Sequence, residues 1–385
     1  MDHIAKLLTR GVEAIYPSTD VLEKTLRSGK KLRVYMGVDP TGIKLHVGHS
    51  IGLSKLQQFA DAGHEAILLF GTGTVLVGDP SQRKEARARI TREEIEENIK
   101  TWKKQVASII DFNKVTIKQN ADWLLKLTLE DLVNIMSHIS ATQLFKRDNF
   151  QSRIEQGGTV WYHETLYPLL QGYDSVAMDV DLEIGGTDQT FNMLIGRELM
   201  QKMKGKEKYV LTTPMIVGTD GRQMSKSTGN CVWLTDTPEN MYGKIMSIPD
   251  DQMTSYSELL TNLSEKDVER LSPIDQKKNL AFSITERFHN KEQATLAQEY
   301  FEKTVQHKET PDEVRQIHLP TGLTSTATVV AAGFAPSNSE AKRLIVQGAV
   351  EIDDQKITDP SMEIANFDGK ILKVGKRNYI KLLKK

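Results

Sequence analysis

Cysteine is almost absent from this chain of 385 residues, in which Cys231 stands alone. A single cysteine excludes an internal disulfide framework and a CxxC metal site, and it fits a reducing compartment. The formal net charge of −1 provides no overall attraction to nucleic acid, so any RNA contact must come from local basic patches. No apolar run is long enough to span a membrane, and the N-terminus lacks the apolar core of a signal peptide. We therefore expect a cytoplasmic protein without membrane contact, with a processed organellar protein as the alternative.

The residues that are present are organised around the stretch 35–50, YMGVDPTGIKLHVGHS. Alternating apolar residues that lead into it predict a strand, which the turn at Pro40 and Gly42 ends. After Leu45 the apolar spacing becomes helical. The stretch therefore predicts a strand, a turn and a helix whose N-terminus favours phosphate groups.

Two histidines lie at the start of this predicted helix. His46 and His49 are three residues apart and are expected on one face of its first turn. Gly48 between them would leave that face bare, so that a ligand could approach the backbone closely. Two imidazole donors together with the helix dipole could hold a polyphosphate. Two surface histidines that open an ordinary helix are an equally good interpretation of the HxGH pattern alone.

A second predicted strand, the continuous apolar run 66–70, is typical of a buried parallel strand. It leads into GTGTVLVGDPS, whose glycines do not fit the GxGxxG dinucleotide fingerprint. Asp79 in this loop could bind an ammonium group, or it could be a turn aspartate before proline. Helical spacing over 83–112 and further helices to about residue 150 predict a helical insertion.

A polar stripe follows in the predicted helix 160–174. Tyr167, Gln171 and Asp174 share one helical face in an apolar setting, where they need either mutual hydrogen bonds or a ligand. Asp174 favours a ligand, because aspartate is seldom fully buried without a partner. A strand expected over 175–184 would then deliver GGTDQ to the sheet edge where the ligand loops of open α/β sheets lie.

The C-terminal half begins with the Ser- and Lys-rich loop DGRQMSKSTGN at 220–230, which on its own would be a solvated surface loop. Helical spacing dominates 234–310, and a linker is expected at 318–322. A helix pair and short strands complete the chain. From residue 369 to the C-terminus there are seven basic residues and no acidic ones.

HxGH followed by MSKS resembles the two signatures of class I aminoacyl-tRNA synthetases. GVDPTG…LHVGH, LLQGYD and GGTDQ make the chain similar, from about residue 30 to its C-terminus, to the bacterial-type tyrosyl-tRNA synthetase family. The resemblance implies an α/β, Rossmann-like catalytic domain with a parallel sheet over 1–219, including a helical insertion at about 83–155. It further implies a helical anticodon-binding-type domain over 220–317 and a small α+β RNA-binding domain over 318–385.

The resemblance also implies an activity. L-tyrosine and ATP would form tyrosyl-adenylate and pyrophosphate, and tyrosine would then pass to the 3′ end of tRNA(Tyr). Neither step demands a protein nucleophile, so positioning and charge stabilisation are the roles to look for. Mg²⁺ is expected with the nucleotide but no dedicated protein metal site is expected, and the family implies a homodimer.

Site residues follow from the resemblance by position. The groups expected to act in catalysis are Thr41, His46, His49 and Lys226, of which Lys226 would reach the pyrophosphate as its loop closes. ATP is expected to contact His46, Gly48, His49, Asp188, Met224, Ser225 and Lys226, with Asp188 on the ribose. Tyrosine is expected to contact Tyr35, Asp39, Asp79, Tyr167, Gln171, Asp174 and Gln189. Within that set Tyr35 and Asp174 match the pair at the hydroxyl, and Gln189 matches a residue near the carboxylate. Tyr167, Gln171 and Asp79 match the groups at the amino end, and Asp39 lines the adenylate pocket.

Two positions depart from the family pattern. Gln223 stands where the KMSKS signature opens with lysine, although Arg222 before it could supply the charge. We expect activity, with weaker transition-state stabilisation unless Arg222 compensates. Glu183 stands where many relatives have glutamine, so its role is open.

The C-terminal string S-x-S-E-A-K-R-L-I-x-Q-G-A-V resembles an RNA-binding module shared with a small-subunit ribosomal protein. Lys342 and Arg343 on its helix, with the basic tail, would contact phosphates. Lysines that merely solubilise a terminus are the alternative.

Two other functions compete. A tryptophan enzyme of the same fold is disfavoured by Tyr35 and Asp174, because an indole has no hydroxyl to pair with them. An RNA-binding protein derived from a synthetase is favoured only by Gln223, and His46, His49 and Lys226 argue against it. Such a protein would bind tRNA without consuming ATP.

Overall fold

The structure is a computed structural model that describes residues 2–80, 91–224, 228–263, 271–306, 315–364, 366–375 and 378–385. The chain divides into two compact units, one formed by Met1–Thr235 with Ile248–Gln276 and one by Asp236–Ser247 with Lys277–Lys385. The domain boundaries expected at 219/220 and 317/318 remain predictions.

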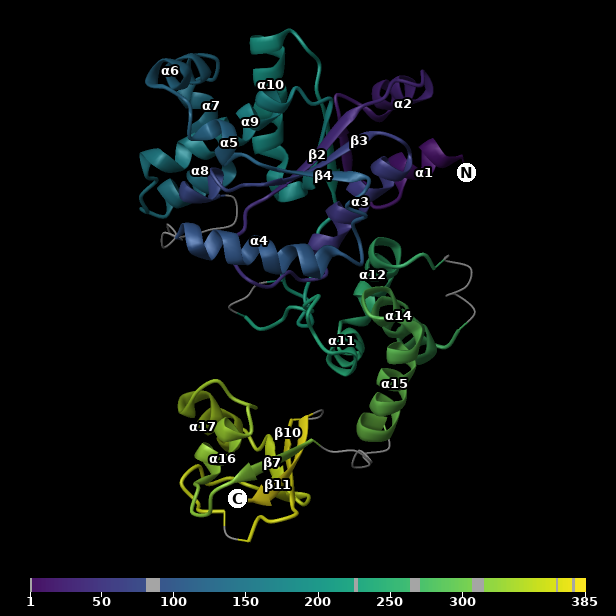
Figure 1. Cartoon of the computed structure of the whole chain (residues 1–385), viewed down its shortest axis with the longest axis vertical. Helices are drawn as coiled ribbons and strands as arrows, with labels where there is room; N and C mark the ends of the chain where they lie inside the picture. The colour runs from purple at the N-terminus through teal and green to yellow at the C-terminus, as the bar shows by residue number, and fades with distance from the viewer. Residues whose placement is uncertain are drawn as a thin grey trace. The chain divides into compact units, whose positions relative to one another are not determined.

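A six-stranded sheet forms the centre of the first unit, in the order β1-β6-β5-β2-β3-β4; Figure 1 labels β2, β3 and β4 within it. Its strands are β1 (Ala14–Tyr16), β2 (Arg33–Val38), β3 (Glu65–Phe70), β4 (Val115–Gln119), β5 (Leu182–Gly186) and β6 (Tyr209–Thr213). All neighbours are parallel except β1, which pairs antiparallel with β6. The parallel α/β sheet predicted from the sequence is confirmed.

Helices cover both faces of this sheet, which explains why every residue of β3 after Glu65 is apolar and buried. Tyr35 in β2 faces α9 (Leu166–Met178), whereas its neighbour Met36 packs against Gly52 in α3 (His49–Asp61). Figure 1 shows α9 beside α10 (Thr190–Lys204) on one side and α3 on the other. The remaining α-helices described in this unit are α1 (His3–Thr9), α2 (Thr19–Arg27), α4 (Arg92–Val106), α5 (Ala121–Leu124), α6 (Leu129–Ser137), α7 (Ala141–Phe145), α8 (Asp148–Glu155) and α12 (Met253–Leu260).

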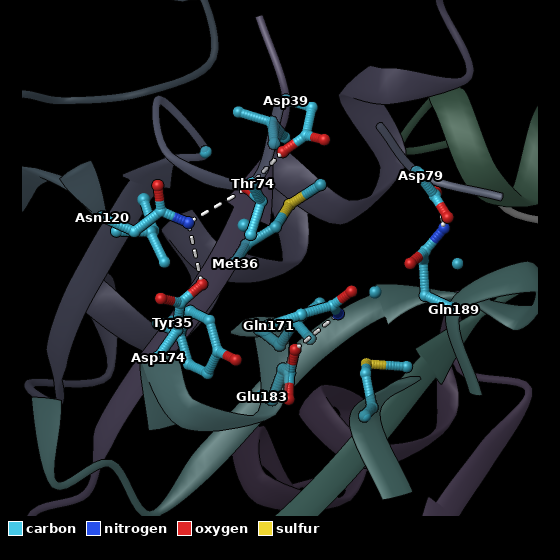
Figure 2. Close-up of a pocket in the computed structure, with 18 of the residues that line it drawn as sticks. Tyr35, Met36, Asp39, Thr74, Asp79, Asn120, Gln171, Asp174, Glu183 and Gln189 are labelled. Carbon is cyan, nitrogen blue, oxygen red and sulfur yellow. Dashed lines mark hydrogen bonds between the residues drawn. The ribbon is translucent and has the colours of Figure 1, made fainter. Parts of the chain in front are cut away.

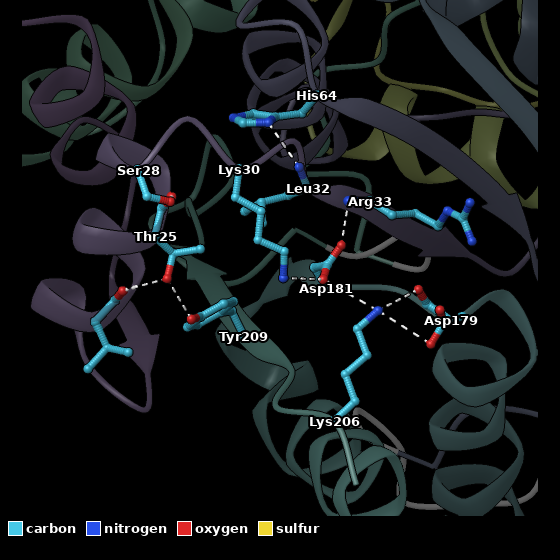
Figure 3. Close-up of polar contacts among 11 residues, drawn as sticks. Thr25, Ser28, Lys30, Leu32, Arg33, His64, Asp179, Asp181, Lys206 and Tyr209 are labelled. Atoms are coloured by element: carbon cyan, nitrogen blue, oxygen red, sulfur yellow. Dashed lines mark hydrogen bonds and ion pairs between the residues drawn. The ribbon is translucent and has the colours of Figure 1, made fainter. Parts of the chain in front are cut away.

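Asp181 anchors the N-terminal edge of the sheet (Figure 3). Its Oδ2 accepts a hydrogen bond from the Arg33 backbone N–H at 2.8 Å, and its Oδ1 lies 3.1 Å from Lys30 Nζ and 3.3 Å from Lys206 Nζ. These contacts tie the start of β2 to the segment that enters β5 and to the end of α10. The opposite edge carries the carboxyl ends of the strands, which is where open α/β sheets bind their ligands.

The second unit begins with helices and ends with a small sheet. Its helices include α11 (Pro238–Ile245), most of α14 (Pro273–Phe288) and α15 (Lys291–Phe301), followed by a π-helical turn (Glu302–Gln306). The sheet has the order β7-β11-β10-β8-β9, with β7 (Gln316–Leu319), β8 (Val350–Ile352), β9 (Gln355–Lys356), β10 (Ile371–Val374) and β11 (Asn378–Lys384). Two helices, α16 (Ser325–Ala331) and α17 (Asn338–Val346), share its apolar core.

Three expectations about elements are wrong. The strand expected at 175–184 begins only at Leu182, because α9 continues to Met178 and ends at Asp179 in the left-handed conformation. The apolar spacing over 2–29 predicts one or two helices, and α1 and α2 are both present, but this prediction misses β1 between them. The linker expected at 318–322 includes the end of β7. Both missed strands are short and pair with segments far away in the sequence, so no local pattern identifies them.

Among the residues that the structure describes, no helix is both long enough and apolar enough to cross a membrane.

Candidate active site

The carboxyl ends of β2, β3 and β5, together with α9, surround a cavity of about 190 Å³ (Figure 2). All the residues predicted to contact tyrosine line it: Tyr35, Asp39, Asp79, Tyr167, Gln171, Asp174 and Gln189. Three of them share one face of α9, as their spacing predicts. We call this space the tyrosine cavity, after the ligand that the sequence predicts for its lining residues.

At one end of the tyrosine cavity lies Asp174, whose residue surface is 2% exposed. Its carboxylate accepts hydrogen bonds from Asn120 Nδ2 at 3.0 Å and from Trp123 Nε1 at 2.8 Å. Burial raises the pKa of Asp174 well above its ordinary range, although these two donors oppose the shift. Tyr35 is fully buried, and its Oη bonds to Ser175 Oγ at 3.0 Å. This end of the cavity therefore presents a buried carboxyl group and a phenol.

Asp39 and Tyr167 form a second polar group. Tyr167 Oη donates to Asp39 Oδ2 at 3.0 Å, and Thr74 Oγ1 donates to Asp39 Oδ1 at 2.8 Å. A Cβ atom on Gly71 would lie 1.9 Å from Asp39 Oδ1, so only glycine leaves room for this carboxylate. Burial, with the charges of Asp39 and Asp79, raises the pKa of Tyr167 well above its ordinary value and keeps the hydroxyl a donor.

Carboxyl groups give the tyrosine cavity its charge. Gln189 Nε2 donates to Asp79 Oδ2 at 2.9 Å and to Asp188 Oδ2 at 3.0 Å. Arg147 Nη2 lies 3.6 Å from Asp79 Oδ1. Among the described residues that line the cavity, four carry carboxyl groups (Asp39, Asp79, Asp174 and Glu183) and none is lysine or arginine. Such a lining favours a ligand with a positively charged group.

A second cavity, of about 210 Å³, lies beside the first and shares His49 with it. The residues predicted to contact ATP that line it are His46, Gly48, His49, Asp188 and Met224. Gln223 lines it as well. We call this space the nucleotide cavity, after the ligand that the sequence predicts for its lining residues.

The placement of His46 corrects the prediction that both histidines lie in the first helical turn. Helix α3 begins at His49, whereas His46 forms a β-bridge with Trp233 just before it. The two imidazole rings nevertheless lie 3.9 Å apart, centre to centre. A Cβ atom on Gly48 would approach His46 Nδ1 to 2.9 Å, so this glycine is required by the neighbouring imidazole.

The other predicted residues lie elsewhere. Thr41 does not line either cavity, and Ser225 and Lys226 lie outside the described residues. Lys342 and Arg343 are exposed on α17, where Arg343 Nε donates to Glu340 at 2.9 Å. Within the described part of the chain, no group of three His, Cys, Asp or Glu side chains could hold a metal ion.

Several residues of the site were not predicted from the sequence. Asn120 and Trp123 come from the segment around α5, about fifty residues before Asp174, and no local motif marks them. Lys208 lies in the polar string KGKEKY, which reads as surface, yet it is completely buried behind the tyrosine cavity. Of these unpredicted residues, only Gly71 lies in a recognisable sequence pattern, because it belongs to a Gly-rich loop.

A class I aminoacyl-tRNA synthetase is the class of protein that this fold and site define. A family model described as tRNA synthetases class I (W and Y) matches residues 27–306, and an S4 domain model matches residues 327–367.

Full-length relatives narrow the class. The tyrosine–tRNA ligase of Thermotoga maritima is 40% identical over 387 residues, which cover 98% of this chain and 96% of that protein. The tyrosine–tRNA ligase of Aquifex aeolicus is 38% identical over 385 residues and covers 98% of both. The chain belongs to the bacterial-type tyrosyl-tRNA synthetase family.

Solved structures support the fold. A C-terminally truncated mitochondrial tyrosyl-tRNA synthetase from Aspergillus nidulans has a TM-score of 0.66 at 23% identity, over 80% of this chain and 93% of that one. The tyrosyl-tRNA synthetase of Archaeoglobus fulgidus complexed with L-tyrosine has a TM-score of 0.61 at 22% identity, over 77% of this chain and 100% of that one.

Proposed function

We propose that this chain, a tyrosine–tRNA ligase by family, binds L-tyrosine in the tyrosine cavity and ATP in the nucleotide cavity beside it. The observation that carries the assignment is that all the residues expected around tyrosine line one cavity, at the carboxyl ends of parallel strands. The carboxylate of tyrosine would then attack the α-phosphate of ATP where the two cavities meet, near His49.

The chemistry of each lining residue supports a role for it. The tyrosine hydroxyl would meet Asp174 and Tyr35, while the ammonium group would meet Asp79, Tyr167 and Gln171. Phenylalanine has no hydroxyl, so it would leave Asp174 and Tyr35 without their partner in the buried cavity, and its binding is therefore disfavoured. Gln189 would lie near the carboxylate, and Asp39 would line the space taken by the adenylate.

The residues of the nucleotide cavity would stabilise the phosphates of ATP. His46 and His49 would donate to phosphate oxygens as charge develops, and Lys226 would reach the pyrophosphate with Gly48, Met224 and Ser225 nearby. Thr41 does not line the cavity and would add a hydroxyl only from the turn before α3. Asp188 would bind the ribose. Loss of one such donor typically lowers the rate about 10²–10³-fold. Mg²⁺ would enter with the nucleotide as part of the substrate.

Transfer to tRNA requires a further surface, for which we propose Lys342 and Arg343 on α17.

We also propose a homodimer in the cytoplasm. Support for the dimer comes from large apolar side chains that are exposed in the first unit, among them Leu129 (76%), Tyr162 (73%) and Val133 (54%).

Amino-acid-dependent ATP–pyrophosphate exchange tests the proposal, with tyrosine, phenylalanine and tryptophan measured side by side. We expect exchange with tyrosine alone, and a sharp loss in Lys226→Ala and in Asp174→Ala. Exchange with tryptophan would assign the cavity to the other amino acid of the group. Absence of exchange with all three would favour an RNA-binding protein without catalysis.

A further inference from the structure

A buried ammonium group lies directly behind the tyrosine cavity. Lys208 Nζ donates to Ser175 Oγ at 2.8 Å, to the Met193 carbonyl at 3.2 Å and to Glu183 Oε2. Three acceptors match the three protons of an ammonium group. Lys208 is completely buried and Glu183 is 2% exposed, so each charge depends on the other for compensation.

The Glu183 carboxylate in turn fixes the orientation of the side-chain amide of Gln171. Its Oε1 accepts from Gln171 Nε2 at 3.0 Å (Figure 2). An ionised carboxylate can only accept, so the amide nitrogen of Gln171 must face Glu183. Gln171 Oε1 then faces the other way, where Asn192 Nδ2 donates to it at 2.9 Å. One lone pair of that oxygen remains for a donor in the cavity.

A second branch leads from the same ammonium group to the other end of the cavity. Ser175 Oγ, which accepts from Lys208, is the partner of Tyr35 Oη. Lys208 Nζ also lies 5.9 Å from the centre of the Tyr35 ring. The residues assigned to the amino end and to the hydroxyl end of tyrosine therefore meet at one buried charge.

We propose that Lys208 is a positioning residue for tyrosine, because it keeps Glu183 ionised and thereby turns the amide oxygen of Gln171 toward the ammonium group of the amino acid. The inference rests on the assignment of the tyrosine cavity made above. A buried ion pair is seldom better for stability than well-packed apolar side chains, so stability alone does not account for this one.

The surroundings determine how the pair responds to pH. Asp174 on α9, Tyr35 on β2 and Arg197 on α10 are the titratable or charged groups that act on it. Burial lowers the pKa of Lys208, and the Glu183 carboxylate opposes that shift. In Lys208→Met, the Glu183 carboxylate would stand beside Asp174 with no positive charge to compensate it. The hydrogen bond that orients the amide of Gln171 would then rest on an uncompensated buried charge, which is costly and sensitive to pH.

Four proteins test the proposal: the wild type, Lys208→Met, Glu183→Gln and the double variant. Tyrosine-dependent ATP–pyrophosphate exchange is measured between pH 6 and 9. We expect Lys208→Met to raise KM for tyrosine about tenfold or more, to make that KM depend on pH, and to leave KM for ATP within about twofold. The double variant should return KM for tyrosine to within about threefold and remove the pH dependence, because it leaves no uncompensated charge behind the cavity and the amide oxygen at position 183 can still accept from Gln171.

Other outcomes would overturn the proposal. An unchanged KM for tyrosine in Lys208→Met would do so. A second such outcome is an equal rise in KM for tyrosine and for ATP that the double variant does not reverse, because this would mean that Lys208 supports only the packing of the core. If Lys208→Met fails to fold, Glu183→Gln takes its place in the test. Glu183→Gln leaves Lys208 without a charged partner and should raise KM for tyrosine, and the double variant, which also removes the lysine, should return that KM toward the wild-type value. Gln171→Ala and Asp79→Ala separate the two levels of inference, since an unchanged KM for tyrosine in both would reject the cavity assignment itself.

Discussion

Gln223 is the residue at which this chain departs most visibly from the family signature. It lines the nucleotide cavity, and its backbone forms a bridge with Val217. The neighbouring Arg222 has a side chain that is 82% exposed and lies 3.3 Å from Asp220. A neutral side chain thus stands at the cavity while a positive charge lies one residue away.

We expect Gln223→Lys to raise the rate of tyrosine-dependent pyrophosphate exchange several-fold, since an added cation would stabilise the charge that develops on the phosphates. Arg222→Ala should lower it, and Gln223→Lys should restore the loss in the double variant. Single-turnover rates of adenylate formation would report the effect. If neither single change alters that rate, the first position of the signature contributes no charge in this protein.

Asp174→Asn is expected to lower kcat/KM for tyrosine about 10- to 100-fold, the cost of leaving a buried partner unsatisfied. Asn120 and Trp123 already point N–H groups at this side chain, so the new amide would bring a donor against two donors.

Phenylalanine provides the internal control for Asp174→Asn, because it has no hydroxyl to lose a partner, and its affinity as an inhibitor of tyrosine-dependent exchange should change much less. Equal losses for tyrosine and phenylalanine would mean that Asp174 maintains the cavity rather than recognising the hydroxyl.

Residues of the candidate site were predictable where they lie on a common motif or helical face, as Tyr167, Gln171 and Asp174 do. Lys208 and Trp123 were not, because each enters the site from its own segment. Burial of a lysine depends on a carboxylate that the fold supplies from another strand, and no local pattern in the sequence encodes that.

At the scale of elements, Lys55 attaches the N-terminal helix α1 to α3. Its Nζ donates to the carbonyls of Leu7 at 2.9 Å and Arg10 at 2.8 Å and to Gln58 Oε1 at 2.9 Å. Lys55 is 2% exposed, and burial with the nearby Arg10 charge lowers its pKa to about 8. The unfolded chain, with a pKa near 10.5, holds the proton more tightly than the folded one.

Folded-state stability should therefore rise with pH between about 8 and 10.5 relative to a variant without the amine, because the unfolded chain binds more protons there. For Lys55→Met we expect the difference in unfolding free energy to shift in favour of the wild type by up to about 3 kcal/mol across this range. Urea unfolding followed by tryptophan fluorescence measures it. Lys100→Met, an exposed lysine on α4, is the matched control. A pH-independent difference for Lys55→Met would contradict the low pKa.

Elements were predictable where the apolar pattern is strong, as in β2, β3 and α3. The short strands β1 and β7 were missed because their stability comes from distant partners. The end of α9 was missed because it depends on the left-handed backbone of Asp179 (φ 51°), which costs little enough for aspartate to leave no mark in the pattern.

At the scale of the whole molecule, activation and tRNA binding are expected to separate. The double change Lys342→Glu and Arg343→Glu should leave tyrosine-dependent pyrophosphate exchange unchanged and raise KM for tRNA in aminoacylation about tenfold. The salt dependence of tRNA binding should also weaken, by about two phosphate contacts.

The exposed pair Lys6→Glu and Lys24→Glu, on α1 and α2, carries the same change of net charge and is the control. Equal effects of the two double variants on tRNA would point to overall charge rather than to a surface on α17.

The strand order of the six-stranded sheet has a consequence for how the protein is made. The edge strand β1 ends at Tyr16, but its only neighbour among the described strands of that sheet is β6, which begins at Tyr209. On the ribosome, β1 must wait while nearly two hundred further residues are translated, whereas β2 and β3 can pair early. Gln189, on the far wall of the tyrosine cavity, is also made late. A nascent chain therefore carries an exposed, incomplete sheet for about half of its synthesis, when chaperones protect such surfaces.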